Sequence, residues 1–156
     1  MTVSKYDSTE DTRKHITTVK IYINRLVNAL TKTAIYHDTS KLYQPEKAIF
    51  DEYTPKLATS TYGSEEYKGF LKGMGIALEH HYANNRHHPE HFENGIKGMN
   101  LIDLCEMISD WKGATLRHND GDILKSIEMN QQRFGYTDEL KQILINTVVT
   151  YFEDKE

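Results

Sequence analysis

Apolar residues recur at intervals of three and four positions along most of this 156-residue chain. The first such run covers residues 9–34 and contains Ile16, Val19, Ile23, Leu26, Val27 and Leu30. That spacing is typical of amphipathic helices, and no stretch alternates at period two as a half-buried strand would. The length suits one domain, so the sequence predicts an all-α, single-domain helical bundle over residues 1–156.

Turn and capping residues divide the rest of the chain into further helices. Pro45 suits the first turn of a short helix that ends near Tyr53, and a loop is expected over 54–63. Ser64 is a candidate N-cap for one helix running through the apolar residues Tyr67, Phe70, Leu71, Met74, Ala77 and Leu78. The polar segment 84–98 is expected to be a loop on the surface.

The last three helices carry the clearest start and stop signals. Asn100 and Thr137 each precede an apolar run as candidate caps, with Ser8 or Thr9 in that role for the first helix, and a further helical pattern covers residues 122–134. Gly135 stands where the helix over 122–134 should end. On the helix after Asn100, we expect a buried stripe that includes Leu101, Leu104, Cys105, Ile108 and Trp111.

Composition narrows the class of protein. The formal net charge of −4 and the pI near 6.1 argue against a nucleic-acid-binding protein, which is usually basic. No apolar run approaches the roughly 18 residues of a membrane span, and no secretory signal pattern is found. A single cysteine excludes an internal disulfide framework and suits the cytoplasm. Whether the chain forms a homo-oligomer is left open.

Histidine is the unusual residue, with eight copies, five of them between His80 and His91. Imidazole and carboxylate groups together suit divalent transition metals such as Mn, Fe, Co, Ni or Zn. The candidate ligands fall into separate groups: His15, the segment 37–41, the pairs His80–His81 and His87–His88, and the acids Asp103, Glu106 and Asp110. We expect His80, His91 and His118 to be ordinary surface or loop residues.

Helix geometry constrains these candidates. In one unbroken helix, His15 and His37 would lie roughly 33 Å apart, too far to share an ion, unless the chain turns back near residues 29–33. His81 continues the apolar face of its helix, whereas His80 points about 100° away, so His81 is the inward candidate. The three acids share one side of their helix, and phase alone leaves open whether that side meets solvent or a polar cavity.

The ordered set of an early His, a His-Asp pair, further histidines and a late Asp resembles the HD-domain metal-dependent phosphohydrolases. His37-Asp38-Thr39-Ser40-Lys41 is similar to their His-Asp-x-Gly-Lys form, with Ser40 where glycine is usual. The stretches 79–90, 103–112 and 133–147 look more closely like an HD-like family of phage and bacterial genomes whose function is unknown. The resemblance implies an HD-like helical bundle.

Carried over by position, the resemblance implies a metal held by His15, His37, Asp38 and Asp110. His81 with His87 or His88 would hold a second ion, so one or two ions are expected. Asp38 would also orient or deprotonate a water, and Lys41 and Arg86 would bind substrate phosphate. Glu106 and Asp103 are candidates for contacts behind the ligands, although Asp103 could instead cap its helix.

These residues imply hydrolysis of a phosphoester, most readily of a nucleotide or similar small phosphate, by water activated on a divalent ion. Lys41 and Asp38 would be the catalytic groups. Two other functions stay open: a dinuclear-iron oxygenase on an HD-like fold, and a degenerate, non-enzymatic HD domain that binds a nucleotide or a host protein.

Overall fold

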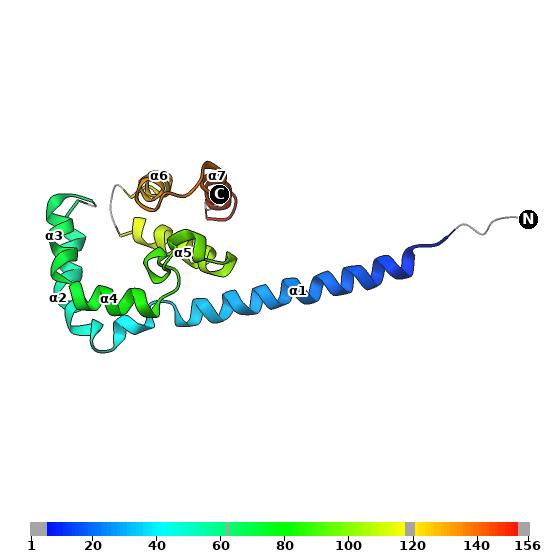
Figure 1. Ribbon diagram of the computed structural model, residues 1–156, viewed down its shortest axis with the longest axis horizontal. Coiled ribbons are helices and arrows are strands. Elements are labelled where there is room, and N and C mark those ends of the chain that lie inside the picture. The colour runs from blue at the N-terminus through cyan, green and yellow to red at the C-terminus, as the bar shows by residue number, and fades with distance from the viewer. Residues whose placement is uncertain (1–5, 62, 118–120, 153–156) are drawn as a thin grey trace, which may run out of the picture.

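The computed structural model describes residues 6–61, 63–117 and 121–152 of the chain (Figure 1). Within those ranges there is no strand, so the predicted all-α class is confirmed. The α-helices are α1 (Thr9–Tyr36), α2 (Glu46–Thr59), α3 (Glu65–Gly73), α4 (Gly75–Asn84), α5 (Leu101–Thr115), α6 (Ile123–Phe134) and α7 (Asp138–Tyr151). Three short 3-10 helices join them: η1 (Thr39–Leu42), η2 (Pro89–His91) and η3 (Gly95–Gly98).

Helix α1 leaves the rest of the molecule as a long arm (Figure 1). It is one unbroken helix of 28 residues, none of them buried. Its main contacts are with α5, and its partly buried positions, Ala29, Leu30 and Thr33, are near its C-terminal end. The chain therefore does not turn back near residues 29–33.

The hydrophobic core lies between α5, α6 and α7, which pack side by side. Its most deeply buried side chains are Met107, Ile108, Ile127, Leu144 and Val148. The hydroxyl of Tyr136 donates to the backbone carbonyl of Ile127 and ties the α6–α7 connection to this core. The stripe predicted for α5 is displaced by part of a turn, because Met107 is buried while Cys105 is exposed. The expectation of a buried Cys105 thiol is therefore wrong.

Helices α2, α3 and α4 form a second group at the other side of the molecule (Figure 1). Helix α2 continues through Pro55 to Thr59, so the predicted end near Tyr53 and the loop from residue 54 are wrong. Pro55 removes one backbone donor, but the partly buried Tyr53 and Leu57 hold both halves of the helix against their neighbours. The single helix predicted after Ser64 is broken at Met74, between α3 and α4.

Most of the predicted helix ends are confirmed. The side chains of Ser64, Asn100, Asp122 and Thr137 accept backbone N–H groups of the turns that follow them. Gly135 ends α6 with a φ of 65°, a conformation that glycine adopts without strain. At α1, the Ser8 side chain makes no capping bond, and Asp7 accepts from the Thr9 amide instead. No helix in the described ranges combines the length and hydropathy that crossing a membrane requires.

Candidate metal centre

The site forms where the end of α1 meets α4 and α5. Helix α1 ends at Tyr36, and His37 and Asp38 follow at the turn into η1. Asp38 has a φ of 57°, a left-handed conformation that Asp tolerates better than most residues and that costs about 1 kcal/mol or more. The Asp38 carboxylate lies against α4, with Oδ1 3.3 Å from His81 Nε2. The backbone strain is located at the residue on which the other site groups converge.

Helix α4 and the segment after it supply three histidines. His81 is on the buried side of α4, with 1% of its surface exposed, as its phase predicts. The expectation of a surface loop over 84–98 is wrong at its beginning, where Asn85, His87 and Pro89 are buried. Both residues of the His87–His88 pair reach the site, so the choice between them does not arise.

The Nε2 atoms of three histidines surround Asp38. His81 Nε2 lies 3.3 Å and His87 Nε2 3.5 Å from Asp38 Oδ1. His37 Nε2 lies 3.6 Å from Asp38 Oδ2 and 3.6 Å from Asp110 Oδ1. These separations exceed hydrogen-bond lengths but match the distances between neighbouring ligands of one ion with bonds of roughly 2.0–2.2 Å.

Two carboxylates, Glu106 partly buried and Glu46 fully buried, lie behind these rings. Glu106 Oε1 accepts from His37 Nδ1 at 2.9 Å and lies 3.0 Å from His87 Nδ1. Glu46, which is fully buried, accepts from His81 Nδ1 at 2.9 Å and from His80 Nδ1 at 2.7 Å. Because a carboxylate accepts, His37 and His81 donate from Nδ1, and each Nε2 faces the centre, where a metal ion would take the place of any proton on it.

Three side-chain atoms of the site are buried without a hydrogen-bond partner among the described residues: Asp38 Oδ1 and both ring nitrogens of His87, of which Asp38 Oδ1 and His87 Nε2 face the centre. A buried polar atom left in this way costs about 1–3 kcal/mol. In addition, His81 Nε2 and His88 Nε2 approach to 2.9 Å, which brings two nitrogen lone pairs together unless a proton or a cation lies between them. A cation bound among these atoms would give the unpaired atoms at the centre a partner and would separate the two nitrogen lone pairs.

The donors form two overlapping groups. One consists of Asp38, His81, His87 and His88, and the other of His37, Asp38, His87 and Asp110. Within each group the ligand atoms lie within 4.8 Å of one another, close to the roughly 4.2 Å between opposite ligands of an ion with 2.1 Å bonds. The residues therefore fit a divalent metal, and the nitrogen-rich donor set suits a transition metal rather than calcium.

The neighbouring charges shift several pKa values. The carboxylates of Asp110 and Glu106 raise the pKa of His37 to about 10. Burial opposes ionisation of Glu106, but His37 and His87 outweigh it and lower its pKa to about 2. Burial also opposes ionisation of Asp38, yet His81 and Lys41 hold its pKa well below the usual value. The carboxylates are thus anionic at neutral pH, as metal ligands must be.

Burial has the opposite effect on His88. It lowers the pKa of this ring to about 3, assisted by the neighbouring His87 and His81. The pKa of Asp110 is also lowered, because His37 outweighs the cost of burying its carboxylate. His88 is therefore neutral at physiological pH and offers a ring nitrogen as a ligand.

Two basic residues predicted to bind phosphate lie near this centre in different settings. Lys41 donates from Nζ to Asp38 Oδ2 and retains partial exposure. The Arg86 guanidinium makes two 2.9 Å bonds to the carboxylate of Asp103, from Nε and from one terminal nitrogen. Asp103 is not among the metal-group residues; it caps α5 in a box with Asn100, the alternative left open for it.

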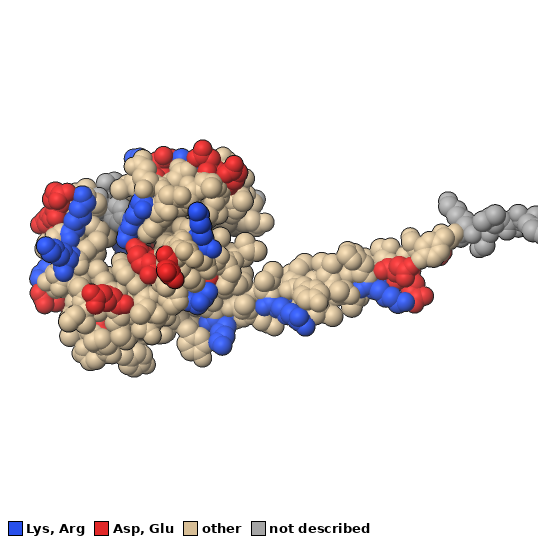
Figure 2. Space-filling view, in the orientation of Figure 1, with Lys and Arg blue, Asp and Glu red and all other residues tan. Residues whose placement is uncertain are grey.

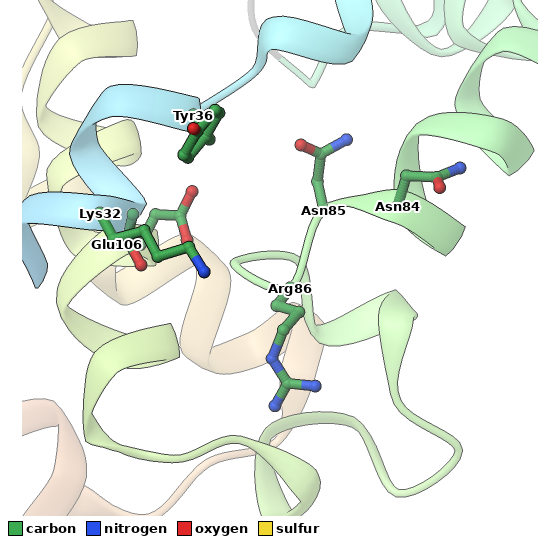
Figure 3. Close-up of a pocket in the computed structure, with 7 residues that line it drawn as sticks. Lys32, Tyr36, Asn84, Asn85, Arg86 and Glu106 are labelled. Carbon is green, nitrogen blue, oxygen red and sulfur yellow. The ribbon is translucent and has the colours of Figure 1, made fainter. Parts of the chain in front are cut away.

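A pocket of about 220 Å³ adjoins the site (Figure 3). Lys32, Thr33 and Tyr36 of α1 line one side together with Glu106, and Asn84, Asn85 and Arg86 line the other. Glu106 and Asn85 connect this pocket to the centre, because Glu106 bonds His37 while Asn85 donates to the backbone carbonyl of His81. A small molecule in the pocket would therefore lie beside the metal-ligating groups.

His15 is the one predicted ligand that the structure separates from the rest. It lies on the same unbroken helix as His37, roughly 33 Å away along the helix axis, and its side chain belongs to neither donor group. The two residues of one chain therefore cannot share an ion. The early His of the HD-like order is wrong as a ligand here, and His87 completes the group of His37 and Asp110 instead.

The three histidines that were expected to be ordinary surface or loop residues have different surroundings. His80 is 40% exposed at its side chain but bonds Glu46, so it is more than a surface residue. His91 is partly buried and its Nδ1 bonds the backbone carbonyl of Tyr82. His118 lies outside the described residues.

Glu46 and Asn85 are the site residues that sequence reasoning missed. In the sequence, Glu46 is not distinguishable from any other acid in the first turn of a helix, where Asp and Glu are common. Its complete burial depends on Ser40, which donates to its carboxylate, and on two histidines about 35 positions away. No pattern in the sequence marks either residue, because their roles arise from tertiary contacts.

Comparison with known proteins identifies the family of the chain but no activity. No curated protein and no solved structure matches the chain. One family model matches residues 4–151, which is nearly the whole length. The chain therefore belongs to a family of unknown function, DUF5662.

Proposed function

We propose that this protein is a metal-dependent phosphohydrolase that cleaves a phosphoester of a small, nucleotide-like substrate. The observation that carries the proposal is the pair of buried, unpartnered atoms Asp38 Oδ1 and His87 Nε2, 3.5 Å apart among further imidazoles and carboxylates. Such a centre is costly without a cation. The His/Asp donor set, without a thiolate, is one that suits hydrolytic metal sites.

A divalent ion held by these residues would lower the pKa of a coordinated water from 15.7 toward about 7. Asp38, whose low pKa keeps it ionised, is placed to accept a hydrogen bond from that water and to orient it. Because the two donor groups share Asp38 and His87, the site offers room for a second ion, as the resemblance to HD domains implies.

The pocket beside the centre is the proposed binding site for the substrate. Lys32 and Arg86 provide positive charge for phosphate oxygens on opposite sides of the opening, and the exposed ring of Tyr36 can stack on a planar group. Lys41 is partly exposed and can exchange its bond to Asp38 for a phosphate oxygen. Arg86 is tied to Asp103, so it also positions the segment that carries His87 and His88.

Metal content is the first test of the site. Purified wild-type protein should hold one or two equivalents of transition metal by mass spectrometry, and His37→Ala should lose most of it. His15→Ala is the matched control, since His15 lies far from both donor groups, and it should keep the wild-type content. Absence of metal in the wild type after reconstitution, or equal losses in the two variants, contradicts the metal site.

Activity is tested separately on a panel of nucleoside phosphates and simple phosphoesters. We expect phosphate release that a chelator abolishes and that added metal restores, and we expect Asp38→Ala to lack it. A metal-loaded protein that releases no phosphate from the panel contradicts the hydrolase but leaves the metal centre standing. If that protein instead consumes oxygen with iron bound, the oxygenase alternative replaces hydrolysis.

A further inference from the structure

The arm formed by α1 carries an apolar stripe that the described parts of the chain leave uncovered. Ile16, Val19, Ile23 and Leu26 lie on one side of the helix and are 59%, 40%, 54% and 48% exposed. Val27, on the same side, is 50% exposed. In Figure 1, the outer half of α1 lies well away from every other helix. The stripe is therefore a contiguous hydrophobic surface facing water.

The same stripe is covered at the other end of the helix. Leu30 and Thr33 continue its spacing and are partly buried near the junction with α5. One continuous face of α1 is thus covered near α5 and exposed to solvent along its outer half. Isolated helices are marginally stable in water, and contiguous exposed apolar patches on soluble proteins commonly mark interaction sites. The bare half requires a partner surface.

We propose that a second copy of this chain covers the stripe, with the two α1 helices packed antiparallel about a two-fold axis near Tyr22. The stripe recurs at Ile16, Val19, Ile23, Leu26 and Leu30, in the alternating three- and four-residue steps of helices that pair with one another. A hollow of about 340 Å³ is lined by His15, Ile16, Val19, Lys20 and Ile23. Consecutive stripe residues and their neighbour form this hollow, as in the holes that receive a partner's side chain.

Charge favours a second copy and an antiparallel arrangement. Between Thr9 and Tyr36 the chain has five basic and two acidic residues. The whole chain has 19 basic and 23 acidic residues, so the remainder has 14 basic and 21 acidic. Figure 2 shows basic side chains along the visible face of the arm and acidic ones at its outer end. With the two arms antiparallel, the outer end of each arm lies beside the end of the partner's α1 that joins the body, so the net positive arm of one copy comes close to the net negative body of the other.

The pairing leaves several charges of α1 outside the apolar contact. With the axis near Tyr22, the stripe from Ile16 to Val27 faces its own copy. Lys14, Arg25 and Lys32 lie on the side of the helix opposite the stripe, away from the contact. The acids Glu10 and Asp11 occupy the first turn, beyond the paired stripe.

The test is the mass of the full-length protein by light scattering at tens of micromolar. We expect a species of about twice 18.1 kDa. Ile23→Glu should convert it to the monomer, because the charge falls in the centre of the contact. Ile21→Glu is the matched control: Ile21 is equally exposed, at 50% against 54%, but lies on the other side of the helix. It should remain dimeric.

A monomeric wild type, or equal dissociation by both variants, overturns the proposal. Sedimentation of a monomer with vesicles of phosphatidylcholine and phosphatidylserine would assign the stripe to a membrane surface instead. Orientation is tested in a Cys105→Ser background by mixing Ile16→Cys and Val27→Cys proteins and oxidising them. Antiparallel packing predicts a crosslink between the two different variants, whereas crosslinks within each variant alone would overturn it.

Discussion

Two carboxylates decide which nitrogen each histidine turns toward Asp38. Glu106 is on the polar side of α5, whose phase left open whether it meets solvent or a polar cavity, and it lies behind the ligands as a candidate for such contacts should. Glu46 is a different case, because nothing in the sequence distinguishes it from an exposed helical acid. Helical phase therefore identifies His81 as an inward residue, and the resemblance identifies Asp110. Neither argument identifies the tertiary partners that fix the histidine rings.

Glu46→Gln is expected to lower metal affinity about 10- to 100-fold while leaving the fold intact. The carboxylate accepts from both His80 Nδ1 and His81 Nδ1. A glutamine offers one acceptor and one NH₂ group, so one of the two rings must change its tautomer or move. Metal titration by calorimetry gives the affinity, and circular dichroism checks the helices.

Glu52→Gln is the control for that variant, because Glu52 is an exposed acid on the same helix, paired with Lys56. It should bind metal as the wild type does. Unchanged affinity in Glu46→Gln would show that the orientation of His81 does not depend on this carboxylate.

Helix boundaries were predicted best where a local side chain sets them. Asn100, Thr137 and Gly135 act within one turn of the chain, and the structure confirms each of them. Boundaries that depend on packing were not predicted. Helix α2 passes through Pro55 because its two halves are held by neighbouring helices, and the break at Met74 leaves Gly73 in close contact with Tyr53 of α2.

A turn near residues 29–33 was the condition for His15 and His37 to share an ion, and the structure does not have it. The sequence there contains neither glycine nor proline, so local chemistry favours a continuous helix, which is what the structure has. The need to bring His15 to His37 came from the resemblance and not from those residues. Local propensity prevailed, and the site was completed by His87 from a segment that was expected to be surface loop.

Asp103 links an element boundary to the site, so its loss should have two effects. Asp103→Ala removes the acceptor of the Asn100 amide and both bonds to Arg86. The lost cap costs about 1 kcal/mol, and the half-exposed ion pair adds at most about another 1 kcal/mol of unfolding free energy. Urea denaturation measures this loss. Metal affinity should fall as well, because Arg86 precedes His87.

Asp122→Ala removes a cap of similar strength from α6, which contributes no residue to the donor groups. It should lower stability by about 1 kcal/mol and leave metal affinity unchanged. If the two variants have the same effect on metal binding, the Arg86–Asp103 pair does not position the histidine segment.

At the scale of the whole molecule, the candidate centre joins parts of the chain that otherwise have few shared contacts. The ligands come from the end of α1, from α4, from the segment after it and from α5. The main hydrophobic core lies between α5, α6 and α7, whereas α2, α3 and α4 form a separate group. A metal ion would therefore act as a tie between the two helix groups and the arm.

Removing the metal should lower the melting temperature. A ligand present at 100 times its dissociation constant stabilises the folded state by about 2.7 kcal/mol, which corresponds to roughly 5–10 °C for a domain of this size. We expect a shift of that order when a chelator is added to the loaded wild type, measured by calorimetry. Asp38→Ala, which lacks the carboxylate common to both donor groups, should show no shift with chelator. A wild-type melting temperature that does not respond to chelator or to added metal would mean that contacts other than the ion hold the two groups together.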